Sequence, residues 1–172
     1  MKRDKVFVPR GSRAVIVPTD HVVRRMAVDV LMVDRWRTRT NVGLVCRANN
    51  PSNGKWALPG GRQKPEDADL VATAIREIFE KTHIEINRDE IEFFDFLDVS
   101  ERDTRDGVPY VSVVLIVEID EARAEKAHAG YDAEAFEWTN LDDITGDMFA
   151  QEFDHLRVIE KFRLTEKTTS CP

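Results

Sequence analysis

Cysteine is scarce in this chain. Only Cys46 and Cys171 occur among 172 residues, one inside an apolar run and one beside the C-terminus. Two cysteines so placed exclude a disulfide framework, and the lack of a CxxC pair excludes the usual structural zinc sites. At this length a single domain can bury a sizeable apolar core without metals or cross-links.

Long apolar runs are missing too. No stretch approaches the ~20 residues that a membrane-spanning helix needs. The N-terminal sequence MKRDKVFVPRGSR lacks the hydrophobic centre of a signal peptide. We therefore expect a cytoplasmic protein with no membrane partner.

An excess of positive charge is the third absence. The chain has 25 Lys and Arg against 32 Asp and Glu, a formal net charge of −7. A field of this sign opposes non-specific attraction to nucleic acid, so we expect no nucleic-acid partner. Any phosphate ligand must be met locally, and a metal ion that bridges carboxylates to phosphate would do so.

The composition that remains, 42% hydrophobic and 33% charged, is that of a soluble globular domain. Residues 1–25 are predicted to form an arm with a hairpin, from strands at 14–18 and 21–25, and residues 165–172 a flexible tail. Between them, period-2 and period-3.6 patterns predict strands at 26–33, 42–47, 91–99, 110–119 and 135–138, and helices at 70–81 and 147–162. This order predicts an α/β (α+β) fold, a mixed sheet with helices on its faces.

The segment GKWALPGGRQKPEDADLVATAIREIFEKTHI, residues 54–84, carries the chemistry. Its helix is predicted to bury a stripe formed by Leu70, Ala74 and Ile78 together with Val71 and Ile75. Residues three and four apart share a helix face, so Glu77 and Glu80 point the same way and Arg76 lies alongside Glu80. Two such carboxylates suit Mg²⁺ or Mn²⁺, which prefer oxygen ligands.

A plainer interpretation of this helix stays open. A charged helix face is usually a solvated face, and Glu77 with Lys81 is a good i,i+4 ion pair. On the helix alone that interpretation is favoured. The preceding WALPGG, whose Gly60 and Gly61 permit close backbone approach, favours the metal site instead.

Residues 61–84 resemble the Nudix box, GX5EX7REUXEEXGU with U aliphatic, and WALPGG resembles the lead-in of that family. The box matches at Gly61, Arg76, Glu77, Ile78, Glu80 and Ile84. One extra residue lies between Gly61 and Arg76, so the early acid is either Asp67 with an insertion after it or is missing, Ala68 standing there. Lys81 replaces the second acid of the EE pair, and His83 replaces the glycine.

The resemblance implies the Nudix fold, a mixed sheet sandwiched between helices, over residues 26–164. The RDTRDG loop, EAFEWTNLDDI and FDHLRVIEKF resemble the branch of ADP-ribose pyrophosphatases and of Nudix domains in NAD-metabolism proteins. The implied cofactor is Mg²⁺ or Mn²⁺, held by Glu77, Glu80 and Gly61, with Arg76 fixing the glutamates. A homodimer is expected by resemblance alone.

The remaining candidates are more loosely indicated. Glu134 is the first choice for an acid outside the box that completes the metal site or acts as base, followed by Glu137 and Glu101. The expected substrate-binding residues are Gly60 and Gly61 together with three arginines that could bind phosphate bidentately, Arg47, Arg102 and Arg105. Asp154 and His155 are expected to be structural. Trp36, Trp56, Trp138 and Phe149 are considered as stacking partners for a base, with Trp56 and Trp138 expected in the core.

Three functions compete. The leading one is hydrolysis of the pyrophosphate bond of a nucleoside diphosphate linked to another moiety, with ADP-ribose or an NAD-related compound preferred. The second is a catalytically weak or inactive Nudix-fold module that senses such a nucleotide; Lys81, His83 and the extra residue favour it. One expectation counts against the sensor: a transcriptional regulator of this kind would carry a DNA-binding domain after residue 162, and the residues there are not expected to form one. The third is a nucleoside triphosphate pyrophosphatase.

Overall fold

The computed structural model describes residues 24–35, 39–48, 52–99, 109–130, 133–150 and 154–169. The predicted N-terminal arm and nearly all of its hairpin lie outside the described residues, as do Trp36, Glu101, Arg102 and Arg105.

The centre of the molecule is a seven-stranded mixed sheet, which confirms the predicted fold class. Its strands are β1 (Arg25–Asp34), β2 (Asn41–Arg47), β3 (Trp56–Ala57), β4 (Gly60–Arg62), β5 (Ile91–Val99), β6 (Tyr110–Glu118) and β7 (Ala133–Asn140). The order β3-β2-β1-β6-β5 holds the main path, while β4 pairs with β1 and β7 pairs with β2. Only β1 and β6 run parallel among these pairs.

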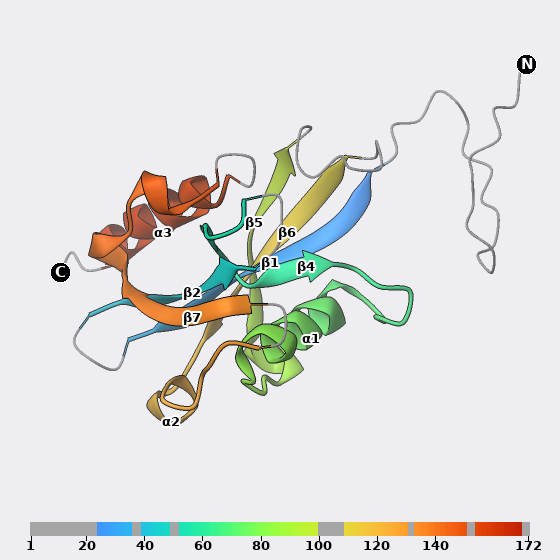
Figure 1. Ribbon diagram of the computed structural model, residues 1–172, viewed down its shortest axis with the longest axis horizontal. Coiled ribbons are helices and arrows are strands. Elements are labelled where there is room, and N and C mark those ends of the chain that lie inside the picture. The colour runs from blue at the N-terminus through green and yellow to red at the C-terminus, as the bar shows by residue number, and fades with distance from the viewer. Residues whose placement is uncertain are drawn as a thin grey trace, which may run out of the picture.

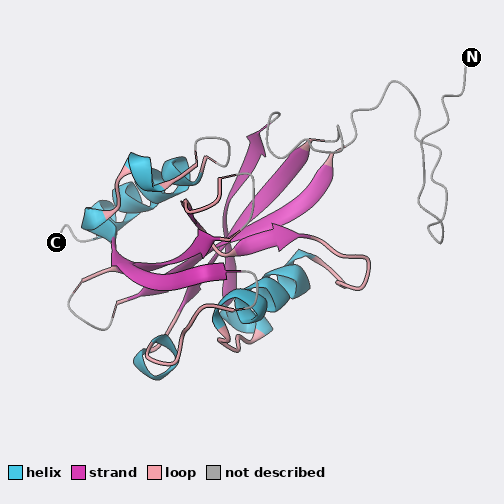
Figure 2. Cartoon of the chain, viewed as in Figure 1, coloured by secondary structure: helices cyan, strands magenta, loops and turns pink. Residues whose placement is uncertain are grey.

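Helices cover the two faces of this sheet (Figure 1). The helix α1 (Leu70–Thr82) packs on one face and α3 (His155–Thr169) on the other, with the short α2 (Glu121–Ala124) near one end (Figure 2). The central strand β1 is buried on both sides: Val28 and Val30 belong to the core under α1, whereas Leu31 and Val33 belong to the core under α3. This near-continuous apolar run is typical of a strand covered on both faces.

The helix α1 begins and ends by specific capping. Asp69 is its N-cap, and its side chain accepts a hydrogen bond of 2.9 Å from the Ala72 amide. His83 ends it in the left-handed region at φ 58°, the conformation that glycine adopts most easily. The predicted inward stripe is partly wrong: Val71 and Ile75 are only half-buried, and the buried set is Thr73, Ala74, Glu77, Ile78 and Thr82.

The predicted final helix over 147–162 is wrong at both ends. A single 3₁₀ turn, η3 (Gly146–Met148), is followed by Phe149, which bridges to Trp56. The helix α3 begins only at His155, because Asp154 stands at φ 54° outside helical space. It then continues to Thr169, into the segment predicted to be the tail.

Smaller elements escape the sequence patterns. The two short strands β3 and β4, the helix α2 and the 3₁₀ turn η1 (Arg88–Glu90) were not predicted as elements. A further 3₁₀ turn, η2 (Leu141–Asp143), follows β7. The last strand is longer than the predicted 135–138. Within the described ranges, no helix has the length and apolar character to cross a membrane.

Candidate functional site

Gly60 and Gly61 lie at the centre of the site. Both belong to β4, where Gly60 pairs with Asp29 and Gly61 with Val28. Successive residues of a strand face opposite sides of a sheet, so Gly61 faces the α1 side and Gly60 faces the α3 side. A Cβ on Gly61 would overlap the Glu77 carboxylate, and a Cβ on Gly60 would overlap the Val28 carbonyl and stand 2.9 Å from Asp29 Oδ1. At Gly60 the obstacle is backbone, whereas at Gly61 it is the end of a side chain that can shift.

On the α1 side, Arg76 gathers three carboxylates, and we call Asp67, Arg76, Glu77 and Glu80 the Arg76 cluster. Arg76 Nη1 donates to Glu77 Oε1 at 2.7 Å and to Glu80 Oε2 at 3.0 Å. Its Nε and Nη2 donate to the two oxygens of Asp67 at 2.9 and 2.8 Å. Asp67 rather than Ala68 is therefore the acid before the helix that pairs with Arg76, and the extra residue of the spacing lies between Asp67 and Arg76.

Electrostatics in the Arg76 cluster follow from these bonds. The hydrogen bonds from Arg76 hold the pKa of the Asp67 carboxyl well below its usual range, although burial opposes them. The hydrogen bond to Asp67 likewise raises the pKa of the Arg76 guanidinium. The two hydrogen bonds from Arg76 to Asp67 also fix the orientation of the Arg76 guanidinium.

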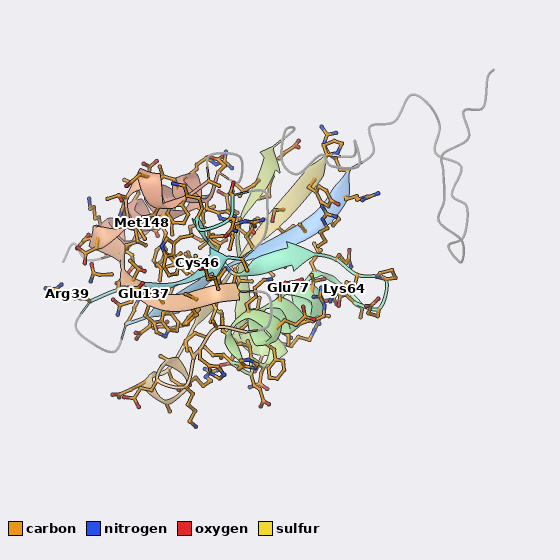
Figure 3. All side chains as sticks on the ribbon, in the orientation of Figure 1. Arg39, Cys46, Lys64, Glu77, Glu137 and Met148 are labelled. Carbon is orange, nitrogen blue, oxygen red and sulfur yellow. The ribbon has the colours of Figure 1, made fainter. Side chains whose placement is uncertain are left out.

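Two lysines complete the charge balance. Lys81 Nζ lies 3.7 Å from Glu77 Oε2, and Lys64 Nζ lies 3.1 Å from Glu80 Oε1. Figure 3 labels Glu77 and Lys64 where α1 adjoins the chain leaving β4. Every carboxylate oxygen of the two glutamates therefore has a basic partner, Arg76 on one side and a lysine on the other. The expected Glu77 to Lys81 ion pair is present, together with one from Lys64 that the helix pattern did not indicate.

The donor set suits a hard divalent cation in its chemistry. Glu77 and Glu80 offer carboxylate oxygens on one helix face, and Gly61, having no Cβ, lets the Glu77 carboxylate approach the backbone of β4. A cation held there must displace an ammonium group. In the part of the chain that the structure describes, no three His, Cys, Asp or Glu side chains already form a metal-holding group.

On the opposite face, a second polar group lies beneath Gly60, and we call Asp29, Ser112 and His155 with the Leu58 amide the His155 network. Ser112 Oγ donates to Asp29 Oδ2 at 2.6 Å, and His155 Nε2 lies 3.3 Å from Asp29 Oδ1. The Leu58 amide donates to His155 Nδ1 at 3.2 Å, so Nδ1 is an acceptor and the ring proton is on Nε2. His155 thereby ties the start of α3 to the WALPGG segment, the structural role expected for it.

The predicted acid outside the box is not brought into the Arg76 cluster by any hydrogen bond or ion pair described above. Glu134 lies on β7, exposed, and accepts a long hydrogen bond of 3.8 Å from the Cys46 thiol. Burial, with Glu134 adding to it, raises the pKa of that thiol. Glu137 lies farther along β7 and is exposed as well. Their catalytic roles stay predictions.

Arg47 is the one predicted phosphate-clamping arginine within the described residues. It ends β2 and lines a cavity of about 90 Å³ with Gly60, Gly61, Arg62 and Tyr110. Arg62 and Tyr110 were not predicted, because no motif distinguishes them from a surface cation and a strand residue.

The aromatic candidates take core positions where they are described. Phe149 is buried, and Trp56 packs against the core under α3. Trp138 packs against the core under α1 and donates from Nε1 to the Ala124 carbonyl at 3.0 Å. Trp56 and Trp138, which were expected in the core, are thus partly buried and pack against it.

Comparison with known families agrees with this geometry. The model of the NUDIX domain matches residues 23–162. The chain belongs to the Nudix family. No curated protein matches it by sequence.

Solved structures share the fold of this Nudix domain. The NUDIX domain of Shewanella oneidensis NrtR, complexed with ADP ribose, is 27% identical at a TM-score of 0.71, and the match covers 87% of this chain and 92% of that one. NrtR complexed with a 27mer DNA matches at 26% identity and a TM-score of 0.61, over 83% of this chain and 63% of that one.

Two further relatives are longer. A MutT/nudix family protein from Enterococcus faecalis is 27% identical at a TM-score of 0.62, covering 72% of this chain and 46% of that one. A bifunctional NMN adenylyltransferase/ADP ribose pyrophosphatase from Francisella tularensis, complexed with AMP and a Mn ion, is 20% identical at a TM-score of 0.62, covering 83% and 42%. This Nudix domain thus spans less than half the length of these two proteins.

Proposed function

We propose that this Nudix domain hydrolyses the pyrophosphate bond of a nucleoside diphosphate linked to another moiety, with ADP-ribose or an NAD-related compound favoured. One observation carries the proposal: a single guanidinium, Arg76, holds Glu77 and Glu80 on the same helix face against the backbone of Gly61. Oxygen ligands so arranged are those that Mg²⁺ and Mn²⁺ use beside phosphates.

Each residue has a distinct part in the proposed reaction. Glu77 and Glu80, with the Gly61 carbonyl, would hold the cation, and Arg76 orients both carboxylates. Bound Mg²⁺ or Mn²⁺ would neutralise the pyrophosphate and lower the pKa of a bound water. Glu134 is proposed to accept the proton of the attacking water, and Arg47, Arg102 and Arg105 to bind phosphate oxygens bidentately.

The preferred substrate rests on the relatives rather than on the pocket. NrtR binds ADP ribose in one solved structure, and the Francisella relative is named an ADP ribose pyrophosphatase and holds AMP and a Mn ion. These support an ADP-ribose-like ligand here. A homodimer remains our expectation, which size-exclusion chromatography with light scattering tests.

A second candidate is a nucleotide sensor that binds without cleaving. Lys81 and Lys64 favour it, because both ammonium groups sit on the carboxylate oxygens that a cation needs. NrtR also has a structure with DNA. The prediction of no nucleic-acid partner therefore rests on net charge alone and is tested by a binding assay with duplex DNA.

Release of AMP from ADP-ribose with Mg²⁺ or Mn²⁺ distinguishes the two candidates. The proposed hydrolase gives metal-dependent release of AMP that saturates with substrate. Saturable binding of ADP-ribose without turnover would leave only the sensor. Running NADH, dinucleoside polyphosphates and oxidised dNTPs alongside identifies a different preferred substrate, including a nucleoside triphosphate.

A further inference from the structure

Two large apolar side chains of β5 are exposed to solvent, and we call Phe93 and Phe96 the β5 aromatic patch. Their exposed fractions are 66% and 57%. Their register partners on β6 are Leu115 and Val113, which belong to or pack against the core under α1, so both rings face the α1 side of the sheet. These partners lie two positions apart, which makes the two rings neighbours on one face. An apolar patch of this kind is typical of a surface that another segment covers.

The position of β5 explains why these rings are exposed. Among the described strands, β5 is the last in the order β3-β2-β1-β6-β5, whereas α1 packs on β1 and β4 (Figure 1). At the edge of β5, Arg157 of α3 donates to the Phe96 carbonyl at 3.1 Å. The edge is therefore partly occupied at this point, and the face of β5 is what a further segment can cover.

The first described residue lies beside this patch. Arg24 precedes β1, and its Nε donates to Asp98 Oδ1 near the end of β5 at 3.3 Å. Asp98 lies two positions after Phe96 and therefore on the same face. A strand rises about 3.3 Å per residue, so the patch begins about 7 Å from Asp98. Residues 1–23, which lie outside the described ranges, join the chain at this point and within reach of the patch.

Residues 14–18 have the composition that such a patch would bind. Their sequence, AVIVP, is the longest apolar run before residue 24, and the Thr-Asp sequence that follows its proline favours a turn back toward the sheet. The five positions from Asp98 to Phe93 span about 17 Å of strand. Ten extended residues span about 33 Å, so the chain between this run and Arg24 is long enough.

Charge favours this segment over a second copy of the chain. The strand β5 carries Glu92, Asp95 and Asp98 and no basic residue, so β5 of another copy would bring only like charge to it. Residues 1–23 carry five Lys and Arg against two Asp. Arg24 continues this basic segment and already pairs with one of the three acids.

We propose that residues 14–18 of the same chain pack on the β5 aromatic patch and cover Phe93 and Phe96. The ion pair between Arg24 and Asp98 sets the point from which the segment reaches the patch. A cover of this kind keeps the last strand of a sheet from binding other chains. The inference does not depend on the proposed hydrolysis.

Trypsin cleavage of the full chain after Arg13 tests the cover, because a protease needs accessible backbone. Phe93→Ser combined with Phe96→Ser should raise the rate of this cleavage at least about tenfold, since the docked segment loses its apolar contacts. Leu164→Ser is the matched control: it removes an apolar side chain that is 67% exposed on α3, and the rate should stay that of the wild type. An unchanged rate in the double variant, or an equal rise in Leu164→Ser, would overturn the proposal.

A nitroxide attached through Ser12→Cys, in a chain that also carries Cys46→Ser and Cys171→Ser, tests where the segment lies. The nuclear magnetic resonance signals of the amides at 93–98 should be lost through proximity to the nitroxide. Adding Ile16→Asp should restore them, because a charge inside the apolar run opposes its packing. This comparison also decides if the double phenylalanine variant does not fold, judged by circular dichroism.

A mixed sample distinguishes the same chain from a second copy. Isotope-labelled chains without the nitroxide, mixed with unlabelled chains that carry it, should keep their amide signals at 93–98. Loss of these signals in the mixture would mean that another copy covers the patch. Signals that persist when the nitroxide is on the same chain would mean that residues 14–18 do not reach it. Either result would overturn the proposal.

Discussion

Two carboxylates approach the same pair of glycines from opposite faces of the sheet, and their surroundings differ. Asp29, 3% exposed beneath Gly60, is held by a hydroxyl and by an imidazole whose second nitrogen is occupied. Glu77, 5% exposed beside Gly61, is held by a guanidinium and an ammonium, and its neighbour Glu80 has a side chain that is 40% exposed. Both carboxylates are buried, but Glu77 shares its guanidinium with Glu80, whose side chain reaches solvent.

This difference indicates that the His155 network supports the fold, whereas the Arg76 cluster can bind a ligand. In the His155 network each described partner is short and buried, so a rearrangement would leave a buried polar group unsatisfied. The lysines that contact the Arg76 cluster are long and flexible, and Lys64 has a side chain that is 43% exposed. A ligand can therefore exchange for an ammonium at Glu77 or Glu80, but nothing exchanges easily at Asp29.

Alanine substitutions at Gly60 and Gly61 should give the largest difference between the two faces. Gly60→Ala forces a Cβ against the Val28 backbone, which cannot move alone, and we expect a loss of at least about 3 kcal/mol in the free energy of unfolding. Gly61→Ala meets only the flexible end of Glu77, so stability should fall by about 1 kcal/mol while turnover falls about 100-fold. Urea unfolding and AMP release measure both. Equal stability losses in the two variants would contradict the distinction.

His155→Phe removes both ring nitrogens and keeps an aromatic ring. It leaves the Leu58 amide and Asp29 Oδ1 without their partner, so the free energy of unfolding should fall by about 3 kcal/mol. His128→Gln, at an exposed histidine whose ring stacks on His83, is the comparison variant and should change the free energy of unfolding by less than about 1 kcal/mol. A similar, small effect in both would mean that the His155 network does not hold the WALPGG segment.

Asp67→Asn loosens Arg76, and we expect it to cost about 2 kcal/mol of unfolding free energy at pH 7. The folded pKa of Asp67 is lowered, so its contribution is present above the unfolded value of about 3.9 and is lost as the pH falls toward the folded value. The gap between wild type and Asp67→Asn should therefore narrow between pH 5 and pH 3 in urea titrations. A gap of constant size down to pH 3 would show that Asp67 is not held by Arg76 in solution.

Lys81→Gln should change the affinity for Mn²⁺, and this is the smallest effect that we expect. Removing an ammonium that lies 3.7 Å from Glu77 Oε2 should tighten Mn²⁺ binding several-fold, because a cation no longer competes with it. Lys126→Gln, at an exposed lysine of the segment after α2, is the control. Weaker Mn²⁺ binding in Lys81→Gln would instead give Lys81 a supporting role in the site.

The sequence predicts the parts of this molecule that depend on local periodicity. The strands of the sheet and α1 follow from apolar spacing, and the shared face of Glu77 and Glu80 follows from helical geometry. The same reasoning places the start of the last helix too early, because Asp154 adopts a left-handed conformation that its sequence neighbours do not indicate.

Contacts between distant segments could not be predicted. Asp29 meets Ser112 and His155 across 83 and more positions of the chain, and no spacing rule connects them. Lys64 and Asp67 lie before the helix, and only the folded turn shows that they reach Glu80 and Arg76. The choice between Asp67 and Ala68 likewise required the path of the turn, since an extra residue shifts every position after it.

Titration of Mn²⁺ into wild type and Glu80→Gln, with AMP release from ADP-ribose measured on the same samples, tests the central claim most directly. The account predicts saturable Mn²⁺ binding and metal-dependent turnover in the wild type. In Glu80→Gln, still folded by circular dichroism, both should fall at least about 100-fold. Mn²⁺ binding and turnover that are unchanged in Glu80→Gln would contradict it.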